Sequence, residues 1–318
     1  MSLLFGIDLG GTKIELVILD QENHHTSLFR ERIPTKQERG YRAILESIQE
    51  LILKGESAVG YKAQSIGIGT PGTLDSRNGL LRGSNTQCLN DKPIQNDLEE
   101  LIKKKVVIDN DANCFSLAEA TIGRAQGYLS VFGIIMGTGV GGGIVINQKV
   151  LHGKQGIAGE WGHNVVDTEI SASYIPGTTE ILVEHQGTPC YCGKRGCVEA
   201  TISGPALEAY YEKSLASKNK TPISLSEIYE PYKKHDEKAE RTINRLIHFF
   251  GKSIATVVNI LDPHIIVLGG GVSNIEELYT HGAEEAKKYI FNPEPEIKIV
   301  QNILGDSAGV FGAAMLTS

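Results

Sequence analysis

Long hydrophobic runs, an excess of basic residues and an abundance of cysteine are all missing from this chain of 318 residues. No uninterrupted apolar stretch approaches the roughly 18 residues that mark a membrane-spanning helix, so we expect no membrane segment. Lys and Arg number 31 against 38 Asp and Glu, a net charge of −7. This balance argues against a nucleic-acid surface, because such surfaces cluster cations. With no basic leader before the first apolar run, the sequence predicts a cytoplasmic protein.

The composition is that of a globular chain with room for a full core. Hydrophobic residues make up 41% of the sequence, and the length suggests two domains of ordinary size. Cysteine is scarce, with five residues in all. Cys88 and Cys114 stand alone, and we expect both to be ordinary buried thiols. The other three lie close together in the second half of the chain.

That cluster consists of Cys190, Cys192 and Cys197, with glycines between them that let the backbone curl. Thiolates at this spacing can converge on a zinc ion, which takes four ligands in structural sites. His163 is the candidate fourth ligand, and His185 is the competing imidazole. A disulfide is less favoured because three sulfurs cannot pair evenly and CxC thiols bridge poorly. Three unrelated core thiols are the remaining alternative.

Two carboxylates flank the cluster, Glu160 before His163 and Glu199 after Cys197. If these residues close around a metal, the two carboxylates come near each other and offer acceptors for the hydroxyls of a polyol. One imidazole nitrogen of His163 would take the metal and the other would be left as a donor. The alternative for each glutamate is a solvated surface charge.

The motif EWGH followed by CYCGKRGCVE resembles the ROK family of bacterial sugar kinases and sugar-responsive repressors. The resemblance implies that His163 and the three cysteines hold a structural zinc ion beside a sugar pocket. It also implies that Glu160, His163 and Glu199 contact the sugar.

The beginning of the chain predicts a strand, a tight glycine turn and a second strand. No helix follows, so neither a P-loop nor a dinucleotide fingerprint applies. Turn glycines can still present backbone N–H groups to phosphate, and a carboxylate at the strand end can hold Mg²⁺ through water. An ordinary hairpin is the alternative. The candidate phosphate-binding residues are Asp8, Gly10, Gly11, Thr12 and Lys13.

A second strand, glycine turn and strand occur near the middle of the chain, where Gly137, Thr138 and Gly139 form the candidate phosphate turn. This segment matches GxGxxG, but the β-branched residues that follow exclude a dinucleotide-binding helix. Two such hairpins suggest two duplicated α/β domains with a nucleotide in the cleft between the copies. The pattern resembles the actin-like ATPase (ribonuclease H-like) fold.

Asp111 is the candidate general base. An apolar strand at 106–108 ends in Asp109-Asn110-Asp111, and side chains at the ends of such strands point toward ligands in open α/β sheets. An aspartate there can orient a hydroxyl and accept its proton during phosphoryl transfer. Capping of the following helix is the alternative. Because NDANC matches the ROK motif, the resemblance implies that Asp111 is catalytic and that Asn110 contacts the sugar.

The resemblance also assigns residues that have a plain explanation as turns. It implies that Gly72 and Asn85 border the sugar. It further implies that Gly269, Gly270 and Gly271 border adenosine.

The coarse element pattern predicts helices at 39–56, 114–120, 204–211, 236–261 and 306–316, and strands at 65–70, 264–268 and 297–304. By resemblance, the last helix returns to the first domain. We therefore expect a small domain of residues 1–118 plus 303–318 and a large domain of residues 119–302.

The resemblance implies an ATP-dependent hexose kinase that uses Mg²⁺ and carries structural Zn²⁺. The motifs are most similar to bacterial fructokinases, which implies fructose, and also mannose, phosphorylated at the 6-hydroxyl. N-acetylglucosamine kinase and glucokinase are the alternatives within the family. A sugar-sensing repressor is the alternative of another class, disfavoured because no helix-turn-helix segment precedes the first hairpin. The family commonly dimerises, so we expect a homodimer.

Overall fold

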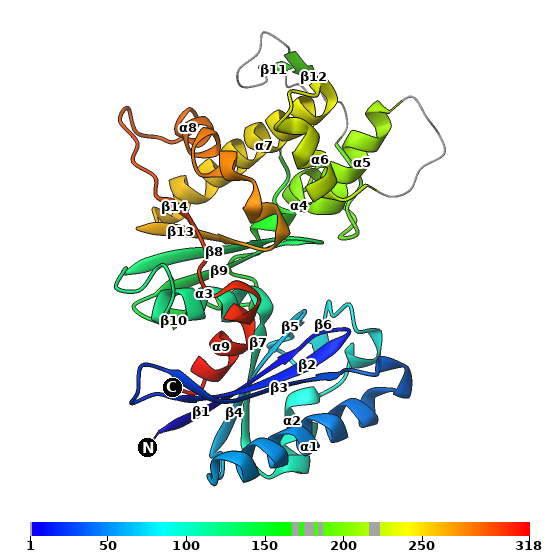
Figure 1. Ribbon diagram of the computed structural model, residues 1–318, viewed down its shortest axis with the longest axis vertical. Helices are drawn as coiled ribbons and strands as arrows, with labels where there is room; N and C mark the ends of the chain where they lie inside the picture. The colour runs from blue at the N-terminus through cyan, green and yellow to red at the C-terminus, as the bar shows by residue number, and fades with distance from the viewer. Residues whose placement is uncertain (1, 167–171, 175–180, 184–186, 216–222) are drawn as a thin grey trace. The chain divides into compact units, whose positions relative to one another are not determined.

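The computed structural model describes residues 2–166, 172–174, 181–183, 187–215 and 223–318 (Figure 1). The chain forms two compact units. The first contains Met1–Gly133, Gly143–Ala158 and Ile303–Ser318, and the second contains Ile134–Gly142 and Gly159–Asn302. The domain boundaries expected at 118/119 and 302/303 remain predictions.

A five-stranded sheet forms the centre of the first unit. Its strands are β1 (Leu3–Leu9), β2 (Lys13–Asp20), β3 (Thr26–Pro34), β4 (Ser65–Thr70) and β7 (Lys105–Asn110), in the order β3-β2-β1-β4-β7. The first three form an antiparallel meander, whereas β4 and β7 run parallel to β1. The carboxyl ends of β1, β4 and β7 therefore meet at one edge of the sheet, where Asp8 and Asn110 lie.

Helices cover both faces of this sheet (Figure 1). On one face α1 (Tyr41–Val59) contacts β2 and β3, and α2 (Ile94–Ile102) contacts α1 and β7. On the other, α9 (Ala308–Met315) contacts β1 and β4, and α3 (Asp111–Thr121) packs along α9. A Cβ on Gly67 would lie 1.8 Å from the carbonyl oxygen of Ala313. Glycine is therefore required in β4 for α9 to approach the sheet.

The second sheet repeats the strand order of the first. It contains β8 (Ser130–Met136), β9 (Val140–Ile146), β10 (Lys149–Val150), β13 (Ile265–Gly269) and β14 (Ile299–Gln301), in the order β10-β9-β8-β13-β14. β9 and β10 are antiparallel, and β13 and β14 are parallel. Counted along the chain, both sheets read 3-2-1-4-5. This match supports the duplication that the two glycine turns predict.

The helices of the second unit gather around α7 (Glu237–Leu261). The others are α4 (Val198–Ile202), α5 (Gly204–Ser214), α6 (Leu225–Tyr232) and α8 (His281–Lys287), and each contacts α7. The Asp236 carboxylate caps α7 by accepting the backbone N–H groups of Lys238 and Ala239 at 3.1 and 2.9 Å. The helix ends at Asp262, which adopts a left-handed φ of 45°. The predicted extent of this helix is confirmed.

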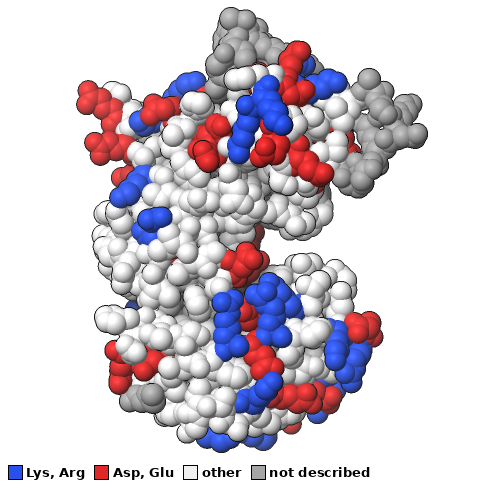
Figure 2. Space-filling model, in the orientation of Figure 1, with Lys and Arg blue, Asp and Glu red and all other residues white. Residues whose placement is uncertain are grey.

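In the described parts of the chain, two short antiparallel strand pairs lie outside the two five-stranded sheets. They are β5 (Thr73–Leu74) with β6 (Leu81–Arg82), and β11 (Ala172–Tyr174) with β12 (Ile181–Val183). Among the described residues, no helix combines the length and apolar character that a membrane span requires. Acidic and basic side chains are interspersed on the face drawn in Figure 2.

The sequence located most long elements but missed short ones. The expected helix at 39–56 extends to Val59, and its predicted apolar face of Ile44, Leu45, Ile48, Leu51 and Ile52 is buried. The expected C-terminal helix is shorter, because the turn Gly305–Ser307 precedes α9. The helices α4 and α8 were not predicted, because helices of five and seven residues show too little periodicity. The helices α2 and α6 and the strand β3 were also missed.

The prediction for the two isolated cysteines is half right. Cys114 is buried in α3, as expected. Cys88 is only half-buried, so the expectation of a buried thiol there is wrong. It lies in a short 3-10 turn, Gln87–Leu89, within a loop. Loop segments tend to run over the surface, which explains the exposure.

Candidate functional site

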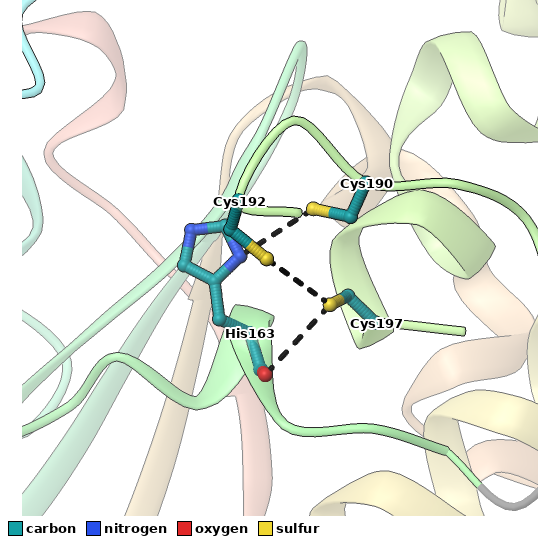
Figure 3. Close-up of side chains that lie close together, drawn as sticks. All are labelled: His163, Cys190, Cys192 and Cys197. Carbon is teal, nitrogen blue, oxygen red and sulfur yellow. Dashed lines mark hydrogen bonds between the residues drawn. The ribbon is translucent and has the colours of Figure 1, made fainter. Parts of the chain in front are cut away.

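Four potential metal ligands converge in the second unit. The donor atoms of His163, Cys190, Cys192 and Cys197 all lie within 4.8 Å of one another, and Figure 3 shows the side chains turned toward a common point. Sγ of Cys190 lies 3.7 Å from Nδ1 of His163, and Sγ of Cys192 lies 3.6 Å from Sγ of Cys197. A tetrahedral zinc ion would hold sulfur pairs about 3.8 Å apart and sulfur–nitrogen pairs about 3.6 Å apart. The donor set therefore fits zinc in both chemistry and spacing.

The glycines of the loop make this convergence possible. Gly193 and Gly196 have φ of 87° and 70°, in the left-handed region that favours glycine. The backbone N–H of Cys190 donates to the carbonyl of Lys194 at 2.9 Å, which closes the turn. The competing imidazole, His185, lies outside the described residues.

The electrostatics of the cluster favour a cation. The pKa of Cys197 rises to about 12, first because the thiol is buried and then because Cys192 and Cys190 lie beside it. Three adjacent thiolates would repel one another in this setting, and a bound divalent cation removes that cost.

Glu160 and Glu199 lie near one another beside the cluster. Glu160 precedes the 3-10 turn Trp161–His163, Glu199 lies in the first turn of α4, and these two elements are in contact. The pKa of Tyr191 rises to about 12, first because its hydroxyl is locally desolvated, although the residue as a whole is exposed, and then because of the charges of Glu199 and Glu160. The structure thus brings Glu160, His163 and Glu199 together, as the sequence predicted.

Two contacts of this group were not foreseen. The Tyr191 hydroxyl lies 3.0 Å from Nε2 of His163, the nitrogen that we expected to be left as a donor for the sugar. Oε2 of Glu199 accepts the backbone N–H of Val140 at 2.9 Å. The only sequence signal for Tyr191 is its position between the first two cysteines.

Glu199 therefore binds the second glycine turn directly. Within that turn the N–H of Gly137 donates to the carbonyl of Gly139 at 2.9 Å, and the N–H of Gly204 donates to the carbonyl of Gly137 at 2.9 Å. A Cβ on Gly139 would lie 2.7 Å from Oε2 of Glu199. Thr138, at the tip, is exposed.

The triple-glycine segment lies against this second turn. Gly270 has φ of 80°, and a Cβ on it would lie 2.4 Å from the carbonyl oxygen of Met136. A Cβ on Gly271 would meet nothing within 4 Å. Gly269 ends β13. The two segments predicted to bind phosphate and adenosine are thus neighbours in the second unit.

The first glycine turn is closed by its own backbone. The N–H of Gly10 donates to the carbonyl of Lys13 at 2.9 Å, and the hydroxyl of Thr35 donates to the carbonyl of Gly10 at 2.7 Å. Gly11 and Thr12 form the tip. A Cβ on Gly11 would lie 3.6 Å from Oδ1 of Asn85.

Asp8 and Asp111 lie at the same edge of the first sheet, because Asp8 pairs with Gly69 and Gly69 pairs with Asp109. The pKa of Asp8 rises to about 6, first because the carboxyl is buried and then because of the Asp111 charge. Capping of α3 is the task of Asn110, whose Oδ1 accepts the backbone N–H of Asn113 at 2.7 Å. Asp111 occupies the first turn of α3 and is exposed. The helix cap and the candidate base are therefore different residues.

Two further positions complete the first unit. Gly72 has φ of 90°, and a Cβ on it would lie 2.3 Å from the carbonyl oxygen of Arg82, so the turn requires glycine whatever else this residue does. Sequence reasoning missed His152, whose Nε2 lies 2.7 Å from the buried carboxylate of Asp109. Nδ2 of Asn113 donates to the same carboxylate at 2.7 Å. A lone histidine in a glycine-rich loop carried no signal for this contact.

Two sheets of matching order, each with a glycine turn between its first two strands, define an α/β protein with the actin-like ATPase fold. The chain belongs to the ROK family, whose model matches residues 4–318.

The chain resembles several ROK proteins along its whole length. The N-acetyl-D-glucosamine kinase of Vibrio atlanticus (strain LGP32) is 35% identical over 314 residues, covering 99% of each chain. The N-acetyl-D-glucosamine kinase of Yersinia pseudotuberculosis serotype O:1b (strain IP 31758) is 34% identical, covering 99% of this chain and 98% of the other.

Solved structures agree with these sequence matches. The ROK hexokinase from Thermus thermophilus has a TM-score of 0.83 at 34% identity, covering 99% of this chain and 97% of the other. A ROK family glucokinase from Streptomyces griseus, in complex with glucose and AMPPNP, has a TM-score of 0.75 at 26% identity, with 99% of each chain covered.

Proposed function

We propose that this protein is an ATP-dependent sugar kinase that transfers the γ-phosphoryl group of ATP to the 6-hydroxyl of N-acetyl-D-glucosamine. The observation that carries the kinase assignment is the exposed Asp111, which follows β7 at the same edge of the sheet as Asp8, because Asp8 pairs with Gly69 and Gly69 pairs with Asp109. Whole-chain similarity to two N-acetyl-D-glucosamine kinases favours that sugar over the fructose and mannose implied by the motifs. Similarity to a ROK hexokinase supports the reaction class.

Asp111 is the proposed general base. Phosphoryl transfer needs a nucleophile held in line and a group that accepts its proton, while the rest of the acceleration comes from positioning and charge. Asp111 is exposed, and Asn110 rather than Asp111 caps the helix. Oδ1 of Asp111 accepts the backbone N–H of Ala112 at 2.8 Å, which orients the carboxylate in the first turn of α3. We assign Asn110, Gly72 and Asn85 to the border of the sugar.

Glu160, His163 and Glu199 are the proposed sugar-binding group of the second unit. Carboxylates accept hydrogen bonds from sugar hydroxyls with charge assistance, which makes them the stronger acceptors. One oxygen of Glu199 is already used by Val140, and its second oxygen is the proposed sugar contact.

The proposed nucleotide contacts come from three backbone segments. The turns Gly10–Lys13 and Gly137–Gly139 are assigned to the phosphates, and Gly269–Gly271 to adenosine. Asp8 is the proposed anchor for Mg²⁺ through water. Its carboxyl is buried beside another acid, and a divalent cation supplies the positive charge that this setting lacks.

The proposed zinc ion has a structural task. With His163, Cys190, Cys192 and Cys197 as ligands, no position is open for substrate. The ion would hold the turn Trp161–His163 against residues 190–197, and through them fix the directions of Glu160 and Glu199.

The test is a coupled assay of ADP release across N-acetylglucosamine, glucose, mannose and fructose. We expect the highest kcat/KM with N-acetylglucosamine. A clear preference for fructose would overturn the sugar assignment but leave the kinase. Sugar binding without sugar-dependent ADP release would overturn the kinase and favour a sensor.

A further inference from the structure

Tyr191 belongs to the metal loop, residues 190–197, but neither the zinc site nor the proposed sugar-binding group assigns its side chain a task. It lies between two proposed ligands, Cys190 and Cys192, yet its side chain is 82% exposed. An exposed tyrosine ring usually needs no explanation. This ring, however, directs its hydroxyl to Nε2 of His163 at 3.0 Å and meets the imidazole edge-on, with ring centres 5.2 Å apart at 84°.

The two ring nitrogens of His163 face different neighbours. Nδ1 faces Sγ of Cys190 at 3.7 Å, on the side of the metal ligands, and Nε2 faces the phenol. If Nδ1 binds a metal, the neutral imidazole carries its proton on Nε2. Nε2–H then donates to the Tyr191 oxygen, so the His163 proton expected for the sugar is engaged by the phenol, whose own O–H is left as a donor for another acceptor.

The surroundings of the phenol indicate where that donor is used. The partner of the hydroxyl, His163, belongs to the group assigned to the sugar and lies in the short turn that Glu160 precedes, so the phenol lies beside that group. Glu160 and Glu199 supply acceptors, and the phenol supplies a donor. A sugar that carries a strong acceptor of its own would match this donor.

We propose that Tyr191 is a sugar-binding and specificity-determining residue, whose hydroxyl donates a hydrogen bond to the carbonyl oxygen of the acetamido group of a 2-acetamido hexose. This inference rests on the proposed function. An amide carbonyl is a stronger acceptor than a hydroxyl, and glucose, mannose and fructose lack it. The exposed ring also provides an apolar surface for the acetyl methyl group.

Tyr191→Phe is the direct test, because it removes only the hydroxyl and keeps the ring and the loop. We expect KM for N-acetylglucosamine to rise about tenfold, the loss of one well-placed hydrogen bond. KM for glucose, kcat and KM for ATP should change less than about twofold. Tyr289→Phe, which removes another partly exposed phenol hydroxyl of the second unit, is the matched control and should change none of these values.

Binding can be measured without turnover. Trp161 is the only tryptophan of the sequence and lies between Glu160 and His163, so its fluorescence should report sugar binding. We expect the Kd for N-acetylglucosamine to rise in Tyr191→Phe to the same extent as KM, with zinc content by metal analysis equal to wild type.

Two results would overturn the proposal. Unchanged affinity for both sugars would remove Tyr191 from the sugar site, and an equal rise for both would move its contact to a hydroxyl that the sugars share. Failure of the proposed function looks different, because wild-type protein would then fail to phosphorylate N-acetylglucosamine at all.

Discussion

The two glycine turns share a sequence pattern but differ in how they are held. In the first, the N–H of Gly10 donates to the carbonyl of Lys13 within the turn, and the hydroxyl of Thr35, directly after β3, donates to the carbonyl of Gly10. In the second, the backbone N–H of Val140 is held by the carboxylate of Glu199, a proposed sugar contact. The first turn is therefore fixed by its own unit's sheet, whereas the second is fixed by the group that would bind the sugar.

We expect this difference to give the two units separate tasks. In the first unit, the glycine turn follows the sheet edge at which Asp8 and Asp111 lie. The second unit couples its turn to the metal loop through Glu199. Changes near the first turn should act on proton transfer and magnesium, and changes near the second should act on sugar affinity. The predictions below test that division.

The largest expected effect follows from replacing Asp111 in the first unit. Asp111→Asn should lower kcat by about 10²- to 10⁴-fold, because the proposed base is lost, and should leave the Kd for sugar within a few fold. Rapid-quench kinetics and Trp161 fluorescence measure the two quantities. Asn110→Ala is a control for helix stability, since it removes the cap and should cost about 1 kcal/mol. Near-normal turnover in Asp111→Asn would remove this residue from the mechanism.

Loss of a metal ligand should instead act on sugar affinity. Cys197→Ser should reduce bound zinc from about one ion per chain to almost none and weaken sugar binding at least about tenfold, because Glu160 and Glu199 lose their support. Metal analysis and fluorescence titration check both. Cys88→Ser removes a half-buried thiol outside the cluster and should retain zinc. Wild-type protein free of zinc, with freely alkylated cysteines, would contradict the site.

Replacing Asp8 should stabilise the folded protein but lower its activity. Its pKa is about 6 in the folded protein against 3.8 for the free side chain, so the ionised form costs the folded state about 1–3 kcal/mol above pH 6. Asp8→Asn should raise the free energy of unfolding by that amount at pH 7.5, as measured in urea, while it lowers activity. The gain should shrink as the pH falls through 6 toward 4, because the wild-type carboxyl then becomes protonated.

Two comparisons sharpen the Asp8 test. Mg²⁺ should stabilise the wild type more than Asp8→Asn. Glu46→Gln removes an exposed carboxylate paired with Arg42 on α1 and should change stability by only a few tenths of a kcal/mol. A pH-independent difference between Asp8→Asn and wild type would contradict the raised pKa.

The smallest effect separates two glycines of the second turn. A Cβ on Gly139 would lie 2.7 Å from Oε2 of Glu199, whereas one on Gly137 would meet nothing within 4 Å. Gly139→Ala should therefore displace the carboxylate and raise KM for the sugar a few fold. Gly137→Ala should leave that KM unchanged, so equal sugar KM values for the two variants would break the proposed link.

The sequence was informative where one local pattern carries the structure. Gly193 and Gly196 between cysteines predicted a loop that gathers ligands, and alternating apolar residues around Gly10 and Gly137 predicted two hairpins. It was uninformative where the contact joins distant segments. The bond between Glu199 and Val140 spans 59 positions, and the pairing of His152 with Asp109 spans 43. No spacing rule connects such residues before the fold is known.

The most direct test of the central claim is to identify the product. Wild-type protein incubated with ATP, Mg²⁺ and N-acetyl-D-glucosamine should form one phosphomonoester at the 6-hydroxyl for each ADP released, as measured by ³¹P NMR and mass spectrometry. ADP without phosphorylated sugar, or neither product despite sugar binding, would contradict the account.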